Sequence, residues 1–180
     1  MDDRAVVEAV IRGDQHAFEQ IVERETAAVF RACYRILGRL HDAEDATQES
    51  FVTAYRALGT FRGEGTLSAW LARIAVRHAL RAAMRRREAV PIDAEPAGSL
   101  ASGTGDPLGD ALDAERGRLV RAAVAELPEP YREIVALRFF ADLSLAEIAQ
   151  ATGRPIGTVK SYLHRGLERL RDRLGVEVAA

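Results

Sequence analysis

Apolar residues recur every three or four positions along most of the first half of the chain, which is the spacing of amphipathic helices. The pattern predicts four helices, over residues 3–13, 15–37, 41–58 and 67–87. Asp14 suits the N-cap of the second helix, and Gly38 suits its end. No stretch before residue 88 alternates between apolar and polar residues as a strand would. The sequence therefore predicts an all-α protein.

A stretch in the middle of the chain breaks this pattern, because proline, glycine, serine and alanine dominate it and its charge is acidic. That composition is typical of a flexible linker, which would let two domains take a variable separation. Helical spacing then returns over residues 112–127 and 131–139. We expect two small helical domains, with a linker between them and a tail, at residues 1–88, 89–112, 113–175 and 176–180.

The last part of the chain carries the signals of two short helices joined by a tight turn. Ser144 and Glu147 have the S-x-x-E spacing of a capping box, which starts a helix. Gly153 is the natural end of that helix, and Pro155 suits the first turn of the next one. Residues 142–174 are therefore predicted to form a helix-turn-helix motif.

The second helix of this motif has an apolar stripe from Val159 to Leu174 and a polar side suited to DNA. Short polar and basic side chains near a helix start are what a major-groove reader needs. An ordinary helical hairpin with a solvated basic face is the alternative. The candidate readers are Thr158, Lys160, Ser161, His164 and Arg165.

One face of the helix predicted over residues 41–58 is charged but has an apolar residue at its centre. Val52 is expected to point outward among Asp45, Glu49 and Arg56. Apolar contact surrounded by charge is typical of a protein-docking face. A merely solvated acidic face is the alternative interpretation.

The helix predicted over residues 67–87 carries arginines at steps of four, with no acidic residue between them. Like charges at this spacing repel, each pair by about 0.2–0.5 kcal/mol, so the row indicates an anionic partner such as phosphate. A solvated arginine-rich helix end is the alternative. Trp70 could serve the core or stack on an unpaired base. The row consists of Arg73, Arg77, Arg81 and Arg85, with His78 beside it.

Composition narrows the possible functions further. The 180 residues are 48% hydrophobic with a net charge of −2, which suits folded domains and argues against indiscriminate coating of nucleic acid. The single cysteine, Cys33, excludes an internal disulfide. No leader or long apolar run is evident, so we expect a cytoplasmic protein. No arrangement typical of a catalytic or metal site occurs, so we expect no enzyme activity, no metal and no cofactor.

Two segments resemble a known family. Residues 42–58 (DAEDATQESFVTAYRAL) look like the polymerase-binding segment of bacterial sigma factors. Residues 144–171 look like their promoter-reading C-terminal domain. The layout, two helical domains and a linker with no middle domain, is similar to the extracytoplasmic-function (ECF) subfamily. The resemblance implies a transcription initiation factor that binds core RNA polymerase, directs it to promoters and helps to open the DNA.

The resemblance also implies roles for individual residues. The clamp helices of the largest polymerase subunit would dock on Asp45, Gln48, Glu49, Val52 and Arg56. The loop at residues 59–66 would form a pocket for a flipped-out base. The minus-ten element would bind Arg62, Trp70, Arg73, Arg77, His78, Arg81 and Arg85. The five candidate readers named above would read the minus-thirty-five element, and an anti-sigma protein would be a further partner.

This chain departs from the family pattern at a few positions. The family usually has an aromatic residue at Leu67, asparagine at Arg77, an acidic residue at Arg81 and arginine at Tyr162. The main rival is a stand-alone helix-turn-helix regulator, which would bind DNA by itself, usually as a dimer. A helical adaptor that binds only protein is a second rival, which the arginine row and the reading helix disfavour.

Overall fold

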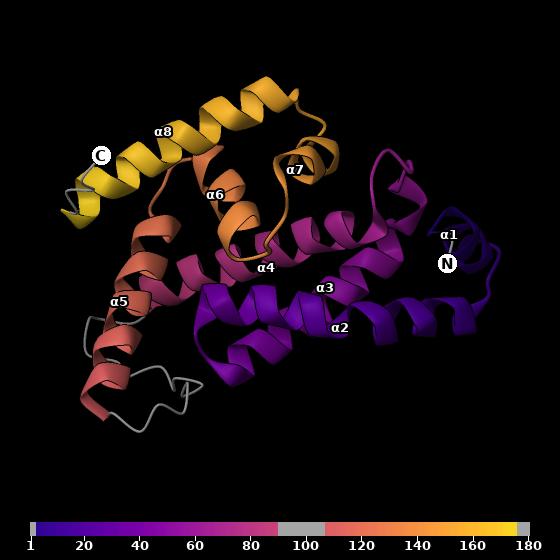
Figure 1. Cartoon of the computed structure of the whole chain (residues 1–180). Helices are drawn as coiled ribbons and strands as arrows, with labels where there is room; N and C mark the ends of the chain where they lie inside the picture. The colour runs from indigo at the N-terminus through magenta and orange to yellow at the C-terminus, as the bar shows by residue number, and fades with distance from the viewer. Residues whose placement is uncertain (1–2, 90–106, 176–180) are drawn as a thin grey trace.

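The structure is a computed structural model that describes residues 3–89 and 107–175, and every regular element in this part of the chain is helical (Figure 1). This confirms the all-α prediction. The elements are α1 (Asp3–Ile11), α2 (Gln15–Leu37), α3 (Leu40–Ala57), the 3₁₀ turn η1 (Leu58–Thr60), α4 (Leu67–Ala89), α5 (Pro107–Ala125), α6 (Tyr131–Phe139), α7 (Leu145–Thr152) and α8 (Ile156–Leu174).

The first domain is built from α1 to α4, with α2, α3 and α4 packed on one another. Ile21, Cys33 and Leu71 are among the residues that fill the core between these helices. Asp14 and Gly38 cap the two ends of α2, as predicted. The Asp14 side chain accepts a hydrogen bond from the backbone N–H of Ala17 at 3.2 Å, and Gly38 ends the helix with a φ of +68°.

The second domain contains the predicted helix-turn-helix in α7 and α8. Its capping box is complete, because Glu147 N–H donates to Ser144 Oγ at 3.2 Å and Ser144 N–H donates to Glu147 Oε2 at 2.8 Å. Gly153 ends α7 in the left-handed region with a φ of +65°. On α8, a Cβ at Gly166 would lie 2.7 Å from Val135 Cγ2, so glycine is what lets α8 approach α6 this closely.

Two details of the predicted organisation need correction. Helix α5 begins at Pro107, so residues 107–112 are helical although they were expected in the linker. Proline fits the first turn of a helix, which explains the earlier start. Leu119 and Val120 were expected to face inward but are 49% and 39% exposed, because only the C-terminal end of α5 packs into the core. Residues 90–106 and the tail at 176–180 lie outside the described residues.

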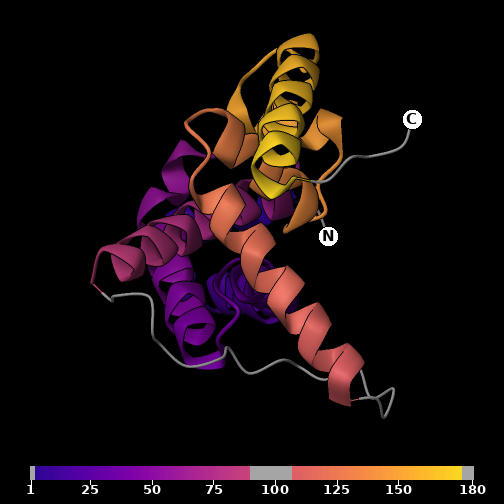
Figure 2. The same ribbon diagram turned by 90° about the vertical axis from the view of Figure 1, so that its left-hand side faces the viewer.

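The two domains lie against each other in this structure. Helix α4 packs on α6 and α7, and α5 packs on α2 and α4. In Figure 1, α6 and α7 lie between α4 and α8. Figure 2 also shows α8 on the side of the second domain that faces away from the first domain. The domain contact therefore involves the helix that carries the arginine row, while α8 stays away from the first domain.

Candidate functional site

The expected docking face lies on the exposed side of α3. Val52 is 51% exposed, although it is apolar. Asp45, Gln48, Glu49 and Arg56 are also exposed. The helix therefore presents one apolar side chain within a charged and polar surface, as its sequence pattern predicted.

Tyr55 enlarges the apolar part of this surface. The sequence pattern placed it on the inner face of the helix, but it is 50% exposed. Its ring packs edge-on against Phe18 of α2, with the ring centroids 4.9 Å apart. Tyr55 lies near the boundary between the two faces of α3, so its packing depended on the position of α2, which periodicity does not give.

His78 lies on the side of α4 that faces α3. Its ring nitrogens are 2.9 Å from Thr53 Oγ1 and 3.3 Å from Glu49 Oε2. Only 19% of its side chain is exposed. The structure therefore groups His78 with the charged face of α3 rather than with the arginine row.

The arginine row on α4 is divided between two surroundings. Arg73, Arg77 and Arg81 line a cavity of about 450 Å³ that α6 closes from the other side. Arg85 instead lines a hollow beside Asp42, Asp45 and Glu49 of α3. Four-residue steps advance about 40° around a helix, so the last arginine has turned away from the first.

Glu133 of α6 supplies the counter-ion that the local sequence lacks. Arg73 Nε donates to Glu133 Oε1 at 2.9 Å, and Arg77 Nε lies 3.6 Å from the same oxygen. Arg73 Nη1 also donates to the carbonyl oxygen of Ala151 at 2.8 Å. These acceptors lie far along the chain from the arginines, so no local pattern could have revealed them.

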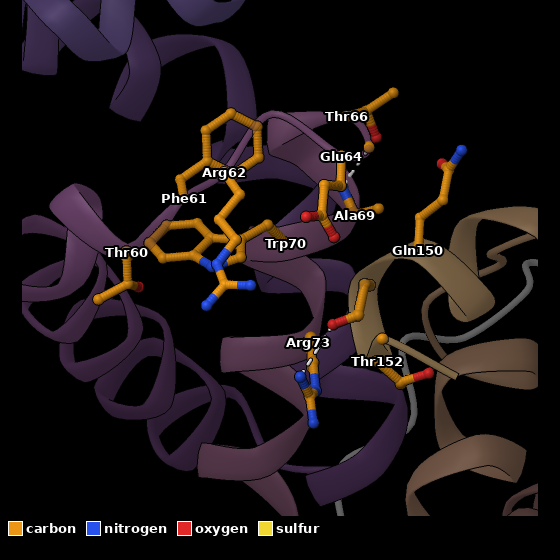
Figure 3. A pocket seen from close by; sticks show the side chains of 13 residues that line it. Thr60, Phe61, Arg62, Glu64, Thr66, Ala69, Trp70, Arg73, Gln150 and Thr152 are labelled. Carbon is orange, nitrogen blue, oxygen red and sulfur yellow. Dashed lines mark hydrogen bonds between the residues drawn. The ribbon is translucent and has the colours of Figure 1, made fainter. Parts of the chain in front are cut away.

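The loop at residues 59–66 forms one wall of a pocket of about 320 Å³ (Figure 3). Trp70 lines it and packs against Phe61, with ring centroids 5.8 Å apart. Arg62 is exposed at its rim. Residues 150–153 of the second domain form the opposite wall. A pocket therefore lies beside this loop, and residues of both domains line it.

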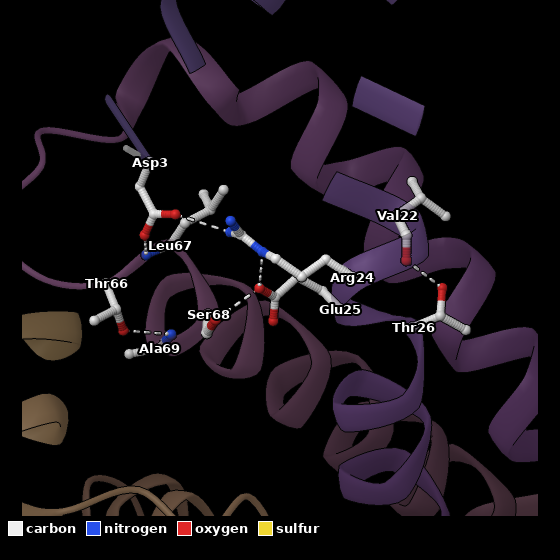
Figure 4. A network of polar contacts seen from close by, with 9 residues as sticks. All are labelled: Asp3, Val22, Arg24, Glu25, Thr26, Thr66, Leu67, Ser68 and Ala69. Carbon is white, nitrogen blue, oxygen red and sulfur yellow. Dashed lines mark hydrogen bonds and ion pairs between the residues drawn. The ribbon is translucent and has the colours of Figure 1, made fainter. Parts of the chain in front are cut away.

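A polar network that sequence reasoning missed holds the start of α4 in place (Figure 4). Asp3 accepts a hydrogen bond from the backbone N–H of Leu67 at 2.8 Å and from Arg24 at 2.9 Å. The buried Glu25 accepts from Arg24 and from Ser68, each at 2.7 Å. Burial alone would lower the pKa of Arg24, but its hydrogen bonds to Glu25 and Asp3 raise it.

Leu67 itself is fully buried. At this departure from the family pattern the side chain therefore belongs to the core and does not face the pocket. Asp3 and Leu67 are 64 positions apart, so no local signal could have linked them.

The reading face on α8 is open to solvent. Lys160, Ser161, His164 and Arg165 are exposed, and Thr158 is half-buried. His164 lies 3.3 Å from Glu168 on the same helix. No acidic side chain in residues 3–89 or 107–175 pairs with Lys160 or Arg165. The apolar stripe faces inward as predicted, since Val159 is fully buried.

Tyr162 lies on the flank of α8, where it packs against the domain. Its ring meets Tyr131 edge-on at 5.7 Å and lies 5.5 Å below the Arg154 guanidinium carbon. The nearby Arg154 Nε is buried without a hydrogen-bond partner. An arginine in place of Tyr162 would lose these ring contacts, so tyrosine here serves the packing of the motif.

No metal-binding cluster occurs among the described residues, and none of their helices is long and apolar enough to cross a membrane. The candidate surfaces described above are the α3 face, the α4 row with its pocket, and the α8 face.

Comparison with known proteins identifies both halves of the chain. Residues 21–89 match the family described as "Sigma-70 region 2", and residues 117–170 match "Sigma-70, region 4". The chain is 34% identical over 177 residues to the ECF RNA polymerase sigma factor SigW of Bacillus subtilis, covering 93% of this chain and 94% of the relative. It is 36% identical over 182 aligned residues to the ECF RNA polymerase sigma-E factor of Haemophilus influenzae, covering 97% and 96%.

Solved structures share the fold. CnrH, solved in complex with the cytosolic domain of CnrY, aligns with a TM-score of 0.64 at 24% identity, over 98% of this chain and 99% of that one. A sigma factor RpoE from Bartonella quintana, solved with the anti-sigma factor NepR, aligns with a TM-score of 0.57 at 24% identity, over 89% and 98%.

Proposed function

The chain belongs to the ECF family of RNA polymerase sigma factors, and from this premise we propose how its surfaces direct transcription initiation. It binds core RNA polymerase, brings it to specific promoters and helps to open the DNA. The observation that carries the proposal is the order of parts in one chain. An exposed docking face comes first, a basic helix with a pocket follows, and a helix-turn-helix comes last.

The docking face on α3 is the surface that binds the clamp helices of the largest polymerase subunit. Val52 would make an apolar contact with the polymerase, and its exposure supports this assignment. Asp45, Gln48, Glu49 and Arg56 would fix the register through charge and hydrogen bonding. Tyr55, exposed beside them, extends the apolar part of this surface.

The two DNA-binding surfaces would hold the two promoter elements. On the minus-ten side, arginines of α4 would contact phosphates and the pocket beside Trp70 would accept a base turned out of the stack. On the minus-thirty-five side, α8 would enter the major groove with its exposed basic face. The proposed minus-ten residues are Arg62, Trp70, Arg73, Arg77, His78, Arg81 and Arg85, of which His78 would have to leave its contacts with Thr53 and Glu49 to reach DNA. The proposed minus-thirty-five residues are Thr158, Lys160, Ser161, His164 and Arg165.

Partners and location follow from the same premise. Two structural neighbours were solved with an anti-sigma factor or a cytosolic partner domain, which supports an anti-sigma protein as a partner here too. The chain would act in the cytoplasm with RNA polymerase, as an initiation factor without catalysis of its own.

In vitro transcription of a genomic library tests the proposal. Core polymerase is incubated with the library with and without the chain, and new start sites are mapped. We expect a set of starts that needs the chain and shares two upstream elements. If no start depends on the chain, and the chain alone binds DNA as a dimer, it is a stand-alone regulator instead.

A further inference from the structure

The loop that forms one wall of the pocket, residues 59–66, is held mainly at its two ends. Residues 62–64 in its middle are exposed. At its first end the 3₁₀ turn η1 is anchored, because Leu58 is buried and its carbonyl oxygen accepts a hydrogen bond from the Phe61 N–H at 3.0 Å. A segment with an exposed middle takes its shape from its attachments, so the second attachment, at the start of α4, matters as much as the first.

The first turn of α4 presents backbone N–H groups without helical partners, as every helix start does, and two kinds of acceptor receive them. Thr66 caps the turn locally. Its Oγ1 accepts from the Ala69 N–H at 3.1 Å, and its carbonyl oxygen accepts from the Trp70 N–H at 3.2 Å. The Leu67 N–H instead donates to Asp3 Oδ2 at 2.8 Å. A carboxylate 64 positions away, in the first turn of α1, thus contributes to the cap of α4.

A second set of contacts ties Asp3 to the body of the first domain (Figure 4). Its other oxygen accepts from Arg24 Nη2 at 2.9 Å, and Arg24 Nε donates to Glu25 Oε1 at 2.7 Å. The same Glu25 oxygen accepts from Ser68 Oγ at 2.7 Å. Glu25 is only 5% exposed, and a carboxylate buried to this degree depends on its partners. The network therefore joins α1, α2 and α4 at one point, within the first domain.

This point of attachment carries the part of α4 that faces the pocket. Thr66, Ala69 and Trp70 all line the pocket, and all lie within one turn of Leu67. The Trp70 ring also packs against Phe61 of the loop. A displacement of this turn would therefore move the tryptophan and the loop together. Among the described residues, the three charged groups of the network lie outside the pocket lining, so they act on the pocket only through α4.

We propose that Asp3 and Glu25 are positioning residues for promoter opening, which fix the first turn of α4 so that Trp70 and the loop keep the shape that receives a flipped-out base. This inference rests on the proposed function and names a support for its pocket that lies outside the pocket. A pocket that is already ordered before the base enters binds it more tightly, because less freedom is lost on binding. Loosening the support should weaken capture of the base and leave contacts to the rest of the promoter unchanged.

The first test combines a change in the protein with the removal of one base. Holoenzyme is formed from core polymerase and the chain. Its affinity is measured on promoter fragments from a mapped start site, each with one abasic nucleotide in the non-template strand of the minus-ten element. We expect one abasic position to weaken wild-type binding about tenfold, as loss of a stacked base should. In Asp3→Ala we expect this difference to fall to about twofold, because the displaced pocket no longer holds the base.

Two further variants are the matched comparisons. Asp3→Asn keeps an acceptor for the Leu67 N–H but loses the charge that meets Arg24, so its abasic difference should lie between those of wild type and Asp3→Ala. Glu8 is an exposed acid of the same helix that pairs with Arg4 one turn away. Glu8→Gln should behave as the wild type. If Asp3→Ala loses the same affinity on intact and abasic promoters, its role is merely structural and the proposal is overturned.

The second test measures the pocket in the free chain. Trp70 is the single tryptophan of the protein, so its fluorescence reports on the pocket without a label. Acrylamide should quench it more strongly in Asp3→Ala and in Ser68→Ala than in the wild type or in Glu8→Gln. Ser68→Ala removes the link between Glu25 and α4 and leaves the Glu25 pair with Arg24 in place, so it avoids a buried unpaired charge. Quenching equal to that of the wild type in both variants would overturn the proposal.

The outcomes separate this inference from the proposed function. If wild-type holoenzyme produces no new start site, the proposed sigma function is wrong and the positioning role is wrong with it. If wild-type holoenzyme opens promoters and its abasic difference persists unchanged in Asp3→Ala, only the positioning role is wrong.

Discussion

Helices α4 and α8 both carry basic residues on one face, yet their surroundings in the fold differ. On α4, Arg73 is engaged by Glu133 and by a backbone carbonyl of the second domain. On α8, Arg165 is exposed. An arginine on a basic helix face is thus engaged by the other domain in one place and exposed in the other. A basic helix face is a candidate for DNA binding, and tertiary contacts decide whether it is available.

The largest expected effect is on the paired surface. Among the residues that the structure describes, Arg73→Ala leaves the buried Glu133 with Arg77, at 3.6 Å, as its remaining ion-pair partner. Loss of one partner of a buried pair costs about 3 kcal/mol or more, so we expect the domains to separate rather than keep this charge buried. Small-angle X-ray scattering would show an increased radius of gyration.

Arg81→Ala is the matched control, because Arg81 is an exposed arginine of the same row and has no ion pair within residues 3–89 and 107–175. It should leave the radius of gyration unchanged. If both variants stay as compact as the wild type, the ion pair with Glu133 does not hold the domains together, and α4 resembles α8 more closely than the structure indicates.

The corresponding change on α8 should affect DNA recognition and leave the domain contact unchanged. Arg165→Ala is expected to cost about 1–3 kcal/mol of discrimination if the guanidinium reads a base. Affinity would be measured for holoenzyme on the mapped promoter and on single-base variants of its minus-thirty-five element. An equal loss on every sequence would show that Arg165 contacts phosphate.

A double substitution tests the α3 face, which stays exposed beside the domain contact. Asp45→Ala with Glu49→Ala should weaken association with core polymerase about tenfold, or about 1.4 kcal/mol. Circular dichroism should show the same helical content as the wild type. Unchanged co-elution with core polymerase would mean that polymerase docks elsewhere.

The smallest effect concerns an exposed ion pair at the edge of the domain contact. The hydrogen bond from Arg87 holds the pKa of Glu126 below its ordinary value, with a further contribution from Arg173. A carboxylate with a lowered pKa stabilises the folded form above its ordinary pKa and loses that contribution as the pH falls through the lowered value.

Glu126→Gln should therefore lower the urea midpoint slightly at pH 7 and converge with the wild type as the pH falls below about 4. The pair is about 40% exposed, so solvent screening keeps the difference small. A constant difference across this pH range would show that Glu126 acts through packing rather than charge.

Local chemistry made most of the fold predictable. Ser144, Glu147 and Gly153 set the boundaries of α7 through contacts within a few residues, and Asp14 and Gly38 do the same for α2. The periodicity likewise predicted that Val52 would be exposed. Predictions failed where burial depended on a distant partner, as for Leu119 and Tyr55, because periodicity gives the faces of a helix but not what covers them.

The sequence by itself determined the all-α class, the helix-turn-helix, the outward Val52 and the basic faces of α4 and α8. Only the tertiary structure decided that Glu133, 60 positions from Arg73, pairs with Arg73 and Arg77 on the first of these basic faces. It also placed His78 against α3 and Asp3 at the start of α4. Helix signals are encoded in neighbouring residues, whereas an ion pair between domains depends on how completed helices pack, and no local spacing records that.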